Sequence, residues 1–334
     1  MPRRRQRCST PTSTVPVVGS STPPTLEERP LNTAIHGLWP ALLLPVSPKG
    51  ELDTPLAIAH AHRMLAAGCD GVTLFGTTGE GPAFTTAERQ ALLESMLGSS
   101  IRPDQVVVTT TASALGDAIT LGRHATRLGV HRQLFMPPFY YNQPRDAGVV
   151  DAVTQVIEGI GSDAIKVLLY HFPGISTYSF SHAAIAELRR RHPAQVAGVK
   201  DSGGDLAHAL ALVQAFPGFA VLVGSEPHVA PVMLAGGCGS INGLGNIAPG
   251  LMRRVIDAPA QVSAADTQLM SALLALLSVK PGMPFVGVYK AMLAEQTGDD
   301  RWLTMRAPLS PLDNTEVQSV RQGYRAIGAL LAHV

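Results

Sequence analysis

The feature that most constrains the fold of this chain is a regular alternation between short apolar segments and longer amphipathic ones. Eight short segments rich in β-branched and other apolar residues are predicted strands: 38–46, 71–75, 105–110, 132–136, 165–171, 196–200, 220–224 and 239–243. The amphipathic segments between them are predicted helices, among them 87–97, 115–128, 181–191 and 206–216. Strict alternation of this kind predicts parallel strands joined by crossover helices.

Eight such units fit a (β/α)8 barrel, whose usual length is about 250 residues. A doubly wound open sheet is the alternative, but no Gly-x-Gly-x-x-Gly motif separates the first predicted strand from its helix. After the eighth strand, three more helices are predicted at 264–277, 283–295 and 316–332. The predicted fold is therefore α/β: a (β/α)8 TIM barrel over residues 34–260, followed by a small C-terminal helical domain over 261–334.

Residues 1–33 differ in composition from the rest of the chain. The first ten residues are basic, and Ser, Thr and Pro dominate from there to Pro30. An apolar segment of the kind that a secretory signal needs does not follow the basic start. We therefore expect a disordered N-terminal extension, with an organelle transit peptide as the alternative.

Composition excludes several classes of function. The formal net charge is +1, from 26 basic and 25 acidic residues, which argues against a nucleic-acid binder. No apolar run reaches the ~18 residues that a membrane span requires. The three cysteines, Cys8, Cys69 and Cys238, are widely spaced. We therefore expect no disulfide framework, and we expect a cytoplasmic location. Only 15% of the residues are charged, which predicts a large core and a subunit interface.

One lysine occupies the position where a barrel places its chemistry, at the carboxyl end of a strand. The five lysines are Lys49, Lys166, Lys200, Lys280 and Lys290. Only Lys200 follows an apolar strand and opens a loop; Lys166 precedes its strand, and the others lie in a loop or in the C-terminal helices. Lys200 either pairs with a neighbouring carboxylate such as Asp201, or acts as a nucleophile that forms a Schiff base with a ketone.

Hydroxyl groups follow three other predicted strands, at the same end of the barrel. Tyr170 ends the fifth strand, Thr77 and Thr78 follow the second, and Tyr141 follows the fourth. Two threonines between glycines form a cradle suited to a small carboxylate. A chain of hydroxyls from Tyr170 through Thr77 to Tyr141 could carry a proton. Each residue also has a structural interpretation, as a core phenol, a turn or a packing residue.

Four segments, in this order and spacing, resemble the motifs of one family. They are Gly76-Thr-Thr-Gly-Glu80, Tyr140-Tyr-Asn-Gln-Pro144, Lys200-Asp-Ser-Gly-Gly-Asp205 and Gly239-Ser-Ile-Asn-Gly-Leu-Gly-Asn246. Over residues 38–256 the sequence is similar to the dihydrodipicolinate synthase / N-acetylneuraminate lyase family of Schiff-base pyruvate lyases and aldolases.

The resemblance implies a role for each motif. Lys200 would condense with C2 of pyruvate, and Tyr170 would give and take protons, with Thr77 and Tyr141 completing the relay. The residues implied in pyruvate binding are Thr78 and Gly79, for the carboxylate, and Ile241, which packs near the keto acid. The resemblance also implies a homotetramer and a covalent imine on Lys200, with no metal or organic cofactor.

One segment departs from the pattern of the synthases, which read Tyr-Asn-x-Pro-x-Arg-Thr-Gly after the proton-transferring tyrosine. Here His171 replaces the asparagine, and Ile175 replaces the arginine, which binds a carboxylate in the synthases. An apolar side chain cannot form that bidentate pair. We therefore expect an aldolase or lyase that forms or cleaves a 2-keto-4-hydroxy acid from pyruvate and another aldehyde, with His171 and Ser176 as candidates for binding the aldehyde.

Two alternatives remain open at this point. The first is 4-hydroxy-tetrahydrodipicolinate synthase itself, condensing pyruvate with aspartate semialdehyde. The second, from another class, is a keto-acid-binding protein that retains the pocket without the chemistry.

Overall fold

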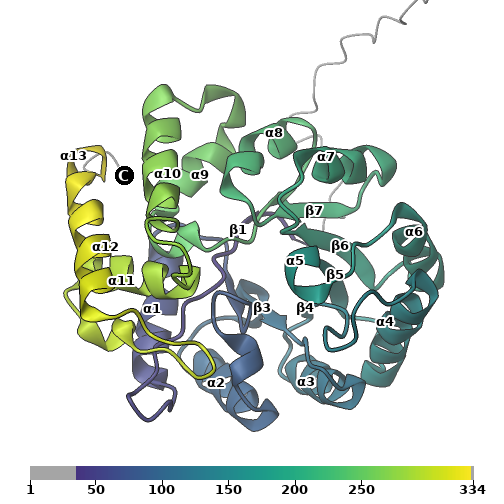
Figure 1. Ribbon diagram of the computed structural model, residues 1–334. Helices are drawn as coiled ribbons and strands as arrows, with labels where there is room; N and C mark the ends of the chain where they lie inside the picture. The colour runs from purple at the N-terminus through teal and green to yellow at the C-terminus, as the bar shows by residue number, and fades with distance from the viewer. Residues whose placement is uncertain (1–34, 332–334) are drawn as a thin grey trace, which may run out of the picture.

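The computed structural model describes residues 35–331 (Figure 1). The predicted disordered extension, residues 1–33, lies outside the described residues. Within 35–331, no helix is long and apolar enough to cross a membrane.

The strands form one parallel sheet of eight in the order β1-β8-β7-β6-β5-β4-β3-β2. Their bounds are β1 Gly37–Leu38, β2 Val72–Leu74, β3 Val106–Thr109, β4 Arg132–Phe135, β5 Lys166–His171, β6 Val196–Asp201, β7 Ala220–Val223 and β8 Gly239–Ser240. A parallel bridge between Ala41 and Thr73 joins the first segment to the second and completes the ring. The predicted TIM barrel is confirmed.

Helices alternate with the strands and surround them (Figure 1). The longer ones are α1 Thr54–Ala66, α2 Thr86–Gly98, α3 Leu115–Arg127, α4 Asp146–Ile160, α6 His182–Arg191, α7 Leu206–Ala215 and α9 Pro249–Asp257, and the shorter ones are α5 Pro173–Ser176 and α8 Val229–Leu234. Side-chain caps set several of the starts, because a Ser, Thr or Asp oxygen there accepts an unpaired helical N–H. Examples are Thr85 before α2, Ser181 before α6 and Asp205 before α7.

The first and last strands are shorter than predicted. Residues 38–46 were expected to form one strand, but Pro40 and Pro45 have no N–H to donate, and β1 ends at Leu38. The extended chain still pairs beyond that point, since the Ala41 N–H donates to Asn242 O at 2.8 Å.

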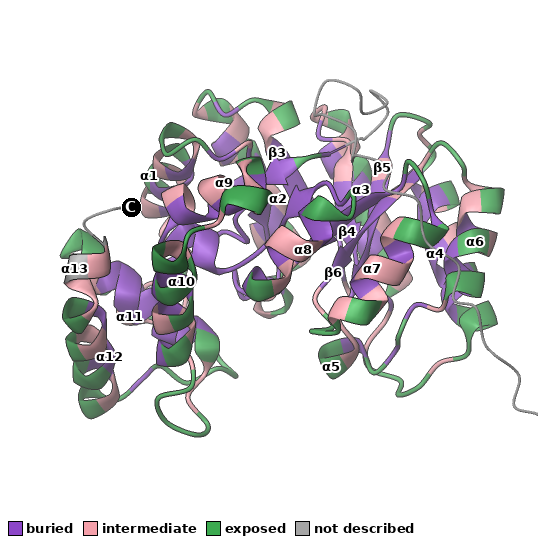
Figure 2. Ribbon diagram, turned by 90° about the horizontal axis from the view of Figure 1, so that it is seen from above, coloured by how far each residue is buried: buried purple, intermediate pink, exposed green. Residues whose placement is uncertain are grey.

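The core has two layers because alternate side chains of a strand point to opposite faces. One layer lies between the sheet and the helices, and the other fills the barrel interior. Tyr170 and Ile241 belong to the interior layer, together with Trp39 and Leu168. Figure 2 shows the buried strands at the centre and the exposed faces of the helices outside.

Four helices follow the barrel: α10 Ala264–Leu276, α11 Phe285–Thr297, α12 Asn314–Ala326 and α13 Gly328–Leu331. The last predicted helix, 316–332, is thus divided at Ile327. Helix α11 is the most enclosed of the four, with every residue from 286 to 294 buried. The division at residue 260 into two domains stays a prediction.

Candidate active site

A cavity of about 300 Å³ opens at the carboxyl ends of the strands, where the sequence predicted the site. Its lining is Ala41, Thr77, Thr78, Tyr170, Phe172, Lys200, Ser202, Gly204, Gly224, Ser225, Glu226, Ile241, Asn242, Gly243, Leu277, Phe285 and Tyr289. Five of the predicted site residues are in this set: Lys200, Tyr170, Thr77, Thr78 and Ile241. The lining residues lie on, or directly after, several elements of the fold: strands β2, β5, β6 and β8, and helix α11.

Lys200 and Tyr170 face each other across neighbouring strands. They are register partners on β6 and β5, so both side chains point into the barrel. Lys200 is 4% exposed, and its Nζ lies 4.1 Å from the centroid of the Tyr170 ring. Asp201 is not the partner of Lys200, because the next residue on a strand points to the opposite face. The lysine is therefore held against an aromatic ring beside open space.

The turn after β2 brings Thr77 to Tyr170. The Thr77 hydroxyl lies 3.1 Å from the Tyr170 hydroxyl, within hydrogen-bonding distance. Thr78 lines the cavity beside it. Two residues of this segment have left-handed backbones, Phe75 with φ 59° and Glu80 with φ 55°, and they set the sharp path of the turn.

Gly79 has a different role from the one predicted. Its N–H donates to Gly76 O at 3.1 Å, so this amide is used inside the turn. A side chain at Gly79 would meet the Leu42 carbonyl oxygen at 2.6 Å, and glycine is required for this close approach. Gly79 therefore shapes the turn and does not line the cavity.

Ile241 packs in the cavity wall, fully buried. Its N–H donates to Val223 O at 3.2 Å. A backbone contact from Ile241 to a bound keto acid would therefore use its carbonyl oxygen.

The structure does not bring Tyr141 to the cavity. Its side chain is 75% exposed, beside Tyr140, which is 76% exposed. The two rings pack edge to face, with centroids 5.3 Å apart. Of the three residues of the predicted relay, the described chain brings Tyr170 and Thr77 together and leaves Tyr141 apart.

A second cavity, of about 190 Å³, lies on the other side of Thr77 and Tyr170. The other residues of its lining are Phe75, Pro82, Thr109, Thr111, Met136, Phe139 and Ile175. The two hydroxyls of the relay thus lie between two cavities.

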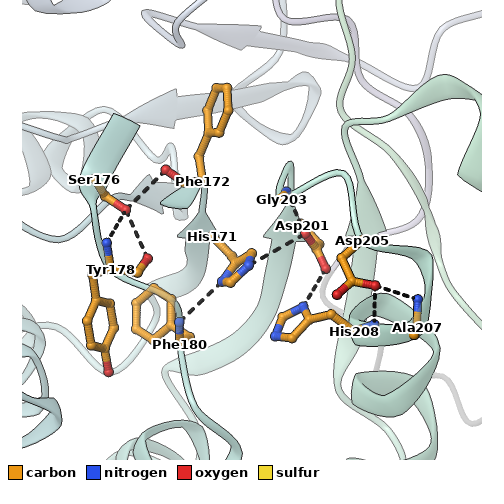
Figure 3. A network of polar contacts seen from close by, with 10 residues as sticks. All are labelled: His171, Phe172, Ser176, Tyr178, Phe180, Asp201, Gly203, Asp205, Ala207 and His208. Carbon is orange, nitrogen blue, oxygen red and sulfur yellow. Dashed lines mark hydrogen bonds and ion pairs between the residues drawn. The ribbon is translucent and has the colours of Figure 1, made fainter. Parts of the chain in front are cut away.

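Neither His171 nor Ser176, the predicted aldehyde contacts, lines the main cavity, and Figure 3 shows the polar contacts that each makes instead. His171 Nδ1 accepts from the Phe180 N–H at 3.2 Å, and burial lowers the pKa of His171 to about 4. The Ser176 hydroxyl lies within hydrogen-bonding distance of two carbonyl oxygens, at 3.1 Å from Phe172 O and at 3.0 Å from Tyr178 O. The structure corrects the prediction for both residues, which hold the loop after β5.

Asp201 is the centre of the network in Figure 3. Its carboxylate accepts from His208 Nδ1 at 2.8 Å and from the Gly203 N–H at 2.8 Å, and it lies 4.0 Å from His171 Nε2. Burial alone would raise the pKa of Asp201, but these hydrogen bonds outweigh it and lower the pKa. The same hydrogen bond raises the pKa of His208.

His171, Asp201 and His208 have their possible ligand atoms within 4.8 Å of one another, which is close enough for a metal ion. The His171 and His208 rings are stacked, 4.2 Å apart and 17° from parallel. An ion needs to lie near the plane of each ring that binds it, and two stacked planes do not meet at one point. The geometry favours a hydrogen-bonded network, while the expectation that the protein needs no metal stays a prediction.

Glu226 and Tyr289 are site residues that the sequence reasoning missed. Both line the cavity, and Glu226 Oε1 accepts from the Leu244 N–H at 3.1 Å and from the Tyr289 hydroxyl at 3.4 Å. Burial raises the pKa of Glu226, while the charge of Lys200 lowers it in part. Tyr289 lies on α11, and its place at the site depends on how that helix folds back on the barrel. No local sequence pattern predicts that.

Comparisons with known proteins agree with this site. The chain matches the dihydrodipicolinate synthetase family over residues 34–327. A DapA-like lyase of Chloroflexus aurantiacus is 33% identical over 300 residues, which cover 88% of this chain and 97% of that protein. The structure of dihydrodipicolinate synthase from Agrobacterium tumefaciens superposes with a TM-score of 0.80 and 31% identity, covering 87% of this chain and 99% of that one.

A sialic acid aldolase of Ruminococcus gnavus has a TM-score of 0.82, covering 91% of this chain and 99% of its own. It is 19% identical, so it supports the fold alone. The family that the four motifs predicted is therefore confirmed: the chain belongs to the dihydrodipicolinate synthetase family and is a lyase of that family.

Proposed function

We propose that this lyase forms a Schiff base between Lys200 and pyruvate, and that it makes or cleaves a 2-keto-4-hydroxy acid. The observation that carries this proposal is the placement of Lys200, buried against the Tyr170 ring, with the Tyr170 hydroxyl 3.1 Å from that of Thr77. A nucleophile and a group that can transfer protons thus face one cavity.

The chemistry follows from those positions. The Lys200 amine attacks C2 of pyruvate, and the carbonyl oxygen leaves as water with one proton taken from Tyr170. A protonated imine remains, beside the Tyr170 phenolate. The imine draws electrons from C3, so C3 loses a proton to Tyr170 and becomes an enamine. The enamine carbon attacks the aldehyde carbon, and Tyr170 returns the proton to the new hydroxyl. Water then hydrolyses the imine and frees Lys200; cleavage follows the same steps in reverse.

The pyruvate carboxylate is placed at the turn after β2. Thr78 offers a hydroxyl there, and the positively charged imine on Lys200 would line the same cavity. This assignment leaves the far part of the cavity for the aldehyde.

The lining of that far part favours an aldehyde without a carboxylate. Among the described lining residues, Lys200 is the one cation, and it is used by pyruvate. The remaining polar groups are the hydroxyls of Ser202, Ser225 and Tyr289, the Asn242 amide and the Glu226 carboxyl. A second carboxylate calls for a cationic partner, whereas substrate hydroxyls are served by these groups. A hydroxylated aldehyde is thus preferred over aspartate semialdehyde.

Tyr141 requires a second copy of the chain to take part in the relay. We propose the homotetramer that the resemblance implies, in which Tyr141 of one copy enters the 190 Å³ cavity beside Thr77 and Tyr170 of another. Mixed tetramers of Tyr141→Phe and Lys200→Ala chains would then regain activity that neither variant has alone. A mixture as inactive as its components would remove Tyr141 from the relay.

Reductive trapping tests the imine. The protein is incubated with pyruvate and borohydride, and the adduct is located by intact mass and peptide mapping. We expect one adduct on Lys200, and the variant Lys200→Ala should not form it. The control variant is Lys166→Ala, which removes a lysine at the opposite end of the neighbouring strand and should still form the adduct. A folded protein that gives no adduct refutes the imine and favours the keto-acid-binding protein.

The aldehyde is tested separately. Pyruvate is supplied with aspartate semialdehyde or with a hydroxylated aldehyde such as glyceraldehyde, and pyruvate consumption is followed. Faster turnover with the semialdehyde would reverse the preference argued above. We also propose a cytoplasmic location, since the chain has three widely spaced cysteines.

A further inference from the structure

The buried ion pair between Lys290 and Glu80 joins α11 to the turn that carries Thr77 and Thr78. Both side chains are 0% exposed, and Lys290 Nζ donates to Glu80 Oε1. The same Nζ donates to Thr304 O at 2.9 Å. Lys290 is separated by 210 residues from Glu80, so the contact exists only when α11 packs against the barrel.

Both carboxylate oxygens of Glu80 accept hydrogen bonds from residues that follow the barrel in the sequence. While Oε1 accepts from Lys290, Oε2 accepts from the Arg306 N–H at 2.7 Å. At its backbone, Glu80 closes the turn: its N–H donates to Thr77 O at 3.1 Å, and its φ is 55°. The conformation of the turn is therefore fixed by a side chain whose partners all lie at residues 290–306.

A buried ion pair such as this one is weak evidence of a contribution to fold stability. Moving two charges out of water is costly, and apolar replacements of buried ion pairs are often as stable as the pair. What an ion pair with hydrogen bonds on both partners supplies is a defined geometry. Here that geometry is the position of a turn whose two threonines face the substrate.

Helix α11 also reaches the cavity through the residue before Lys290. Tyr289 lines the cavity and donates to Glu226, which lines it as well. Two consecutive residues of one helix thus contact a cavity-lining side chain, Glu226, and the turn that carries Thr77 and Thr78.

We propose that Glu80 and Lys290 are a positioning pair for pyruvate binding: docked α11 holds the Thr77–Thr78 turn in the conformation that accepts the substrate carboxylate. This inference rests on the proposed function, because it assumes that pyruvate is the ligand of the turn. Neither residue touches the substrate, and the pair acts through Thr77 and Thr78.

Pyruvate titration of the borohydride adduct on Lys200 tests the pair. In Lys290→Met and Glu80→Gln we expect the half-saturating pyruvate concentration to rise between about 10-fold and 100-fold, as small displacements of binding groups do. Lys280→Met is the matched control, since Lys280 lies just before α11 and forms an exposed ion pair with Glu316 at 2.7 Å. It should leave the half-saturating concentration unchanged.

Adduct yield at saturating pyruvate and the thermal unfolding midpoint separate positioning from folding. A loss of folded protein lowers the yield, whereas a displaced turn raises the half-saturating concentration. In the double variant Glu80→Gln/Lys290→Met, which buries no unpaired charge, we expect the unfolding midpoint to recover while the half-saturating concentration stays high.

Two results would overturn the inference. One is a half-saturating concentration within twofold of wild type in a folded Lys290→Met or Glu80→Gln protein. The other is a double variant in which midpoint and half-saturation recover together, since the pair would then matter only for folding. A wild-type protein that forms no adduct is a different failure, which removes the proposed function and this inference with it.

Discussion

Acid should destabilise this protein through His60, which is buried beneath the loop after β8. His60 is 3% exposed, and its Nε2 lies 2.9 Å from Asn246 Oδ1. That oxygen also accepts from the Leu43 N–H at 3.0 Å, so it is an acceptor and His60 Nε2 carries the proton. The other nitrogen, Nδ1, is buried with no hydrogen-bond partner among the described residues. A second proton on this ring would be an unpaired buried charge.

The size of the effect follows from the pKa. Burial, and after it the charge of Arg63, lowers the pKa of His60 from 6.5 to about 3. Below pH 6.5 the unfolded chain binds a proton that the folded protein does not bind. The contribution of neutral His60 to the free energy of unfolding is therefore fully present above pH 6.5, and it is lost as the pH falls toward 3. The loss is about 1.4 kcal/mol per pH unit within that window, or about 2 kcal/mol between pH 7 and pH 5.

Urea unfolding at pH 7, 6 and 5, followed by tryptophan fluorescence, measures this loss. The variant His60→Gln keeps a donor for Asn246 but cannot take up a proton. We expect its free energy of unfolding to fall by about 2 kcal/mol less than that of wild type between pH 7 and pH 5. His171, whose pKa is lowered to about 4, contributes to both proteins and cancels in the comparison. The same loss in wild type and variant would refute the argument.

Three further predictions concern the site. Tyr170→Phe should slow exchange of the C3 protons of pyruvate at least about 100-fold while the adduct on Lys200 still forms, and equal exchange rates would remove Tyr170 from proton transfer. Asp201→Asn should lower the pKa of His208, which Asp201 now raises; a proton NMR titration of the histidine ring that shows no change would contradict the network of Figure 3. Glu226→Gln should raise the KM for a hydroxylated aldehyde more than the KM for pyruvate, and steady-state kinetics with each substrate varied will decide between that and the reverse order.

The barrel and the centre of the site were predictable from the sequence for one physical reason. In a parallel barrel, the residue at the carboxyl end of each strand lies at the same open end of the barrel, independently of how the other segments pack. That rule places Lys200 and Tyr170 together, and the structure puts them in register on β6 and β5. The same logic brings Thr77 to Tyr170, because the turn after β2 opens at the same end.

The alternation of side chains along a strand could have corrected one prediction. His171 follows Tyr170 on the same strand, and successive residues point to opposite faces. If Tyr170 points inward, His171 points toward the helices, as it does. By contrast, no local rule places Tyr289 or Lys290, because every residue of α11 from 286 to 294 is buried and a pattern of alternating faces is therefore missing there.

Two of the four motifs carry a carboxylate directly beside a site residue. Glu80 closes the turn of Thr77 and Thr78, and Asp201 follows Lys200. Left in the cavity, either carboxylate would compete for the Lys200 amine and repel a substrate carboxylate.

The fold removes both from the cavity. Glu80 pairs with Lys290 and Asp201 with His208, each on the side away from the substrate. The third carboxyl, Glu226, does line the cavity, and burial raises its pKa, which favours the neutral form there. The amine of Lys200 thus lies against an aromatic ring, and the imine proposed for it would be the main positive charge that an anionic substrate encounters.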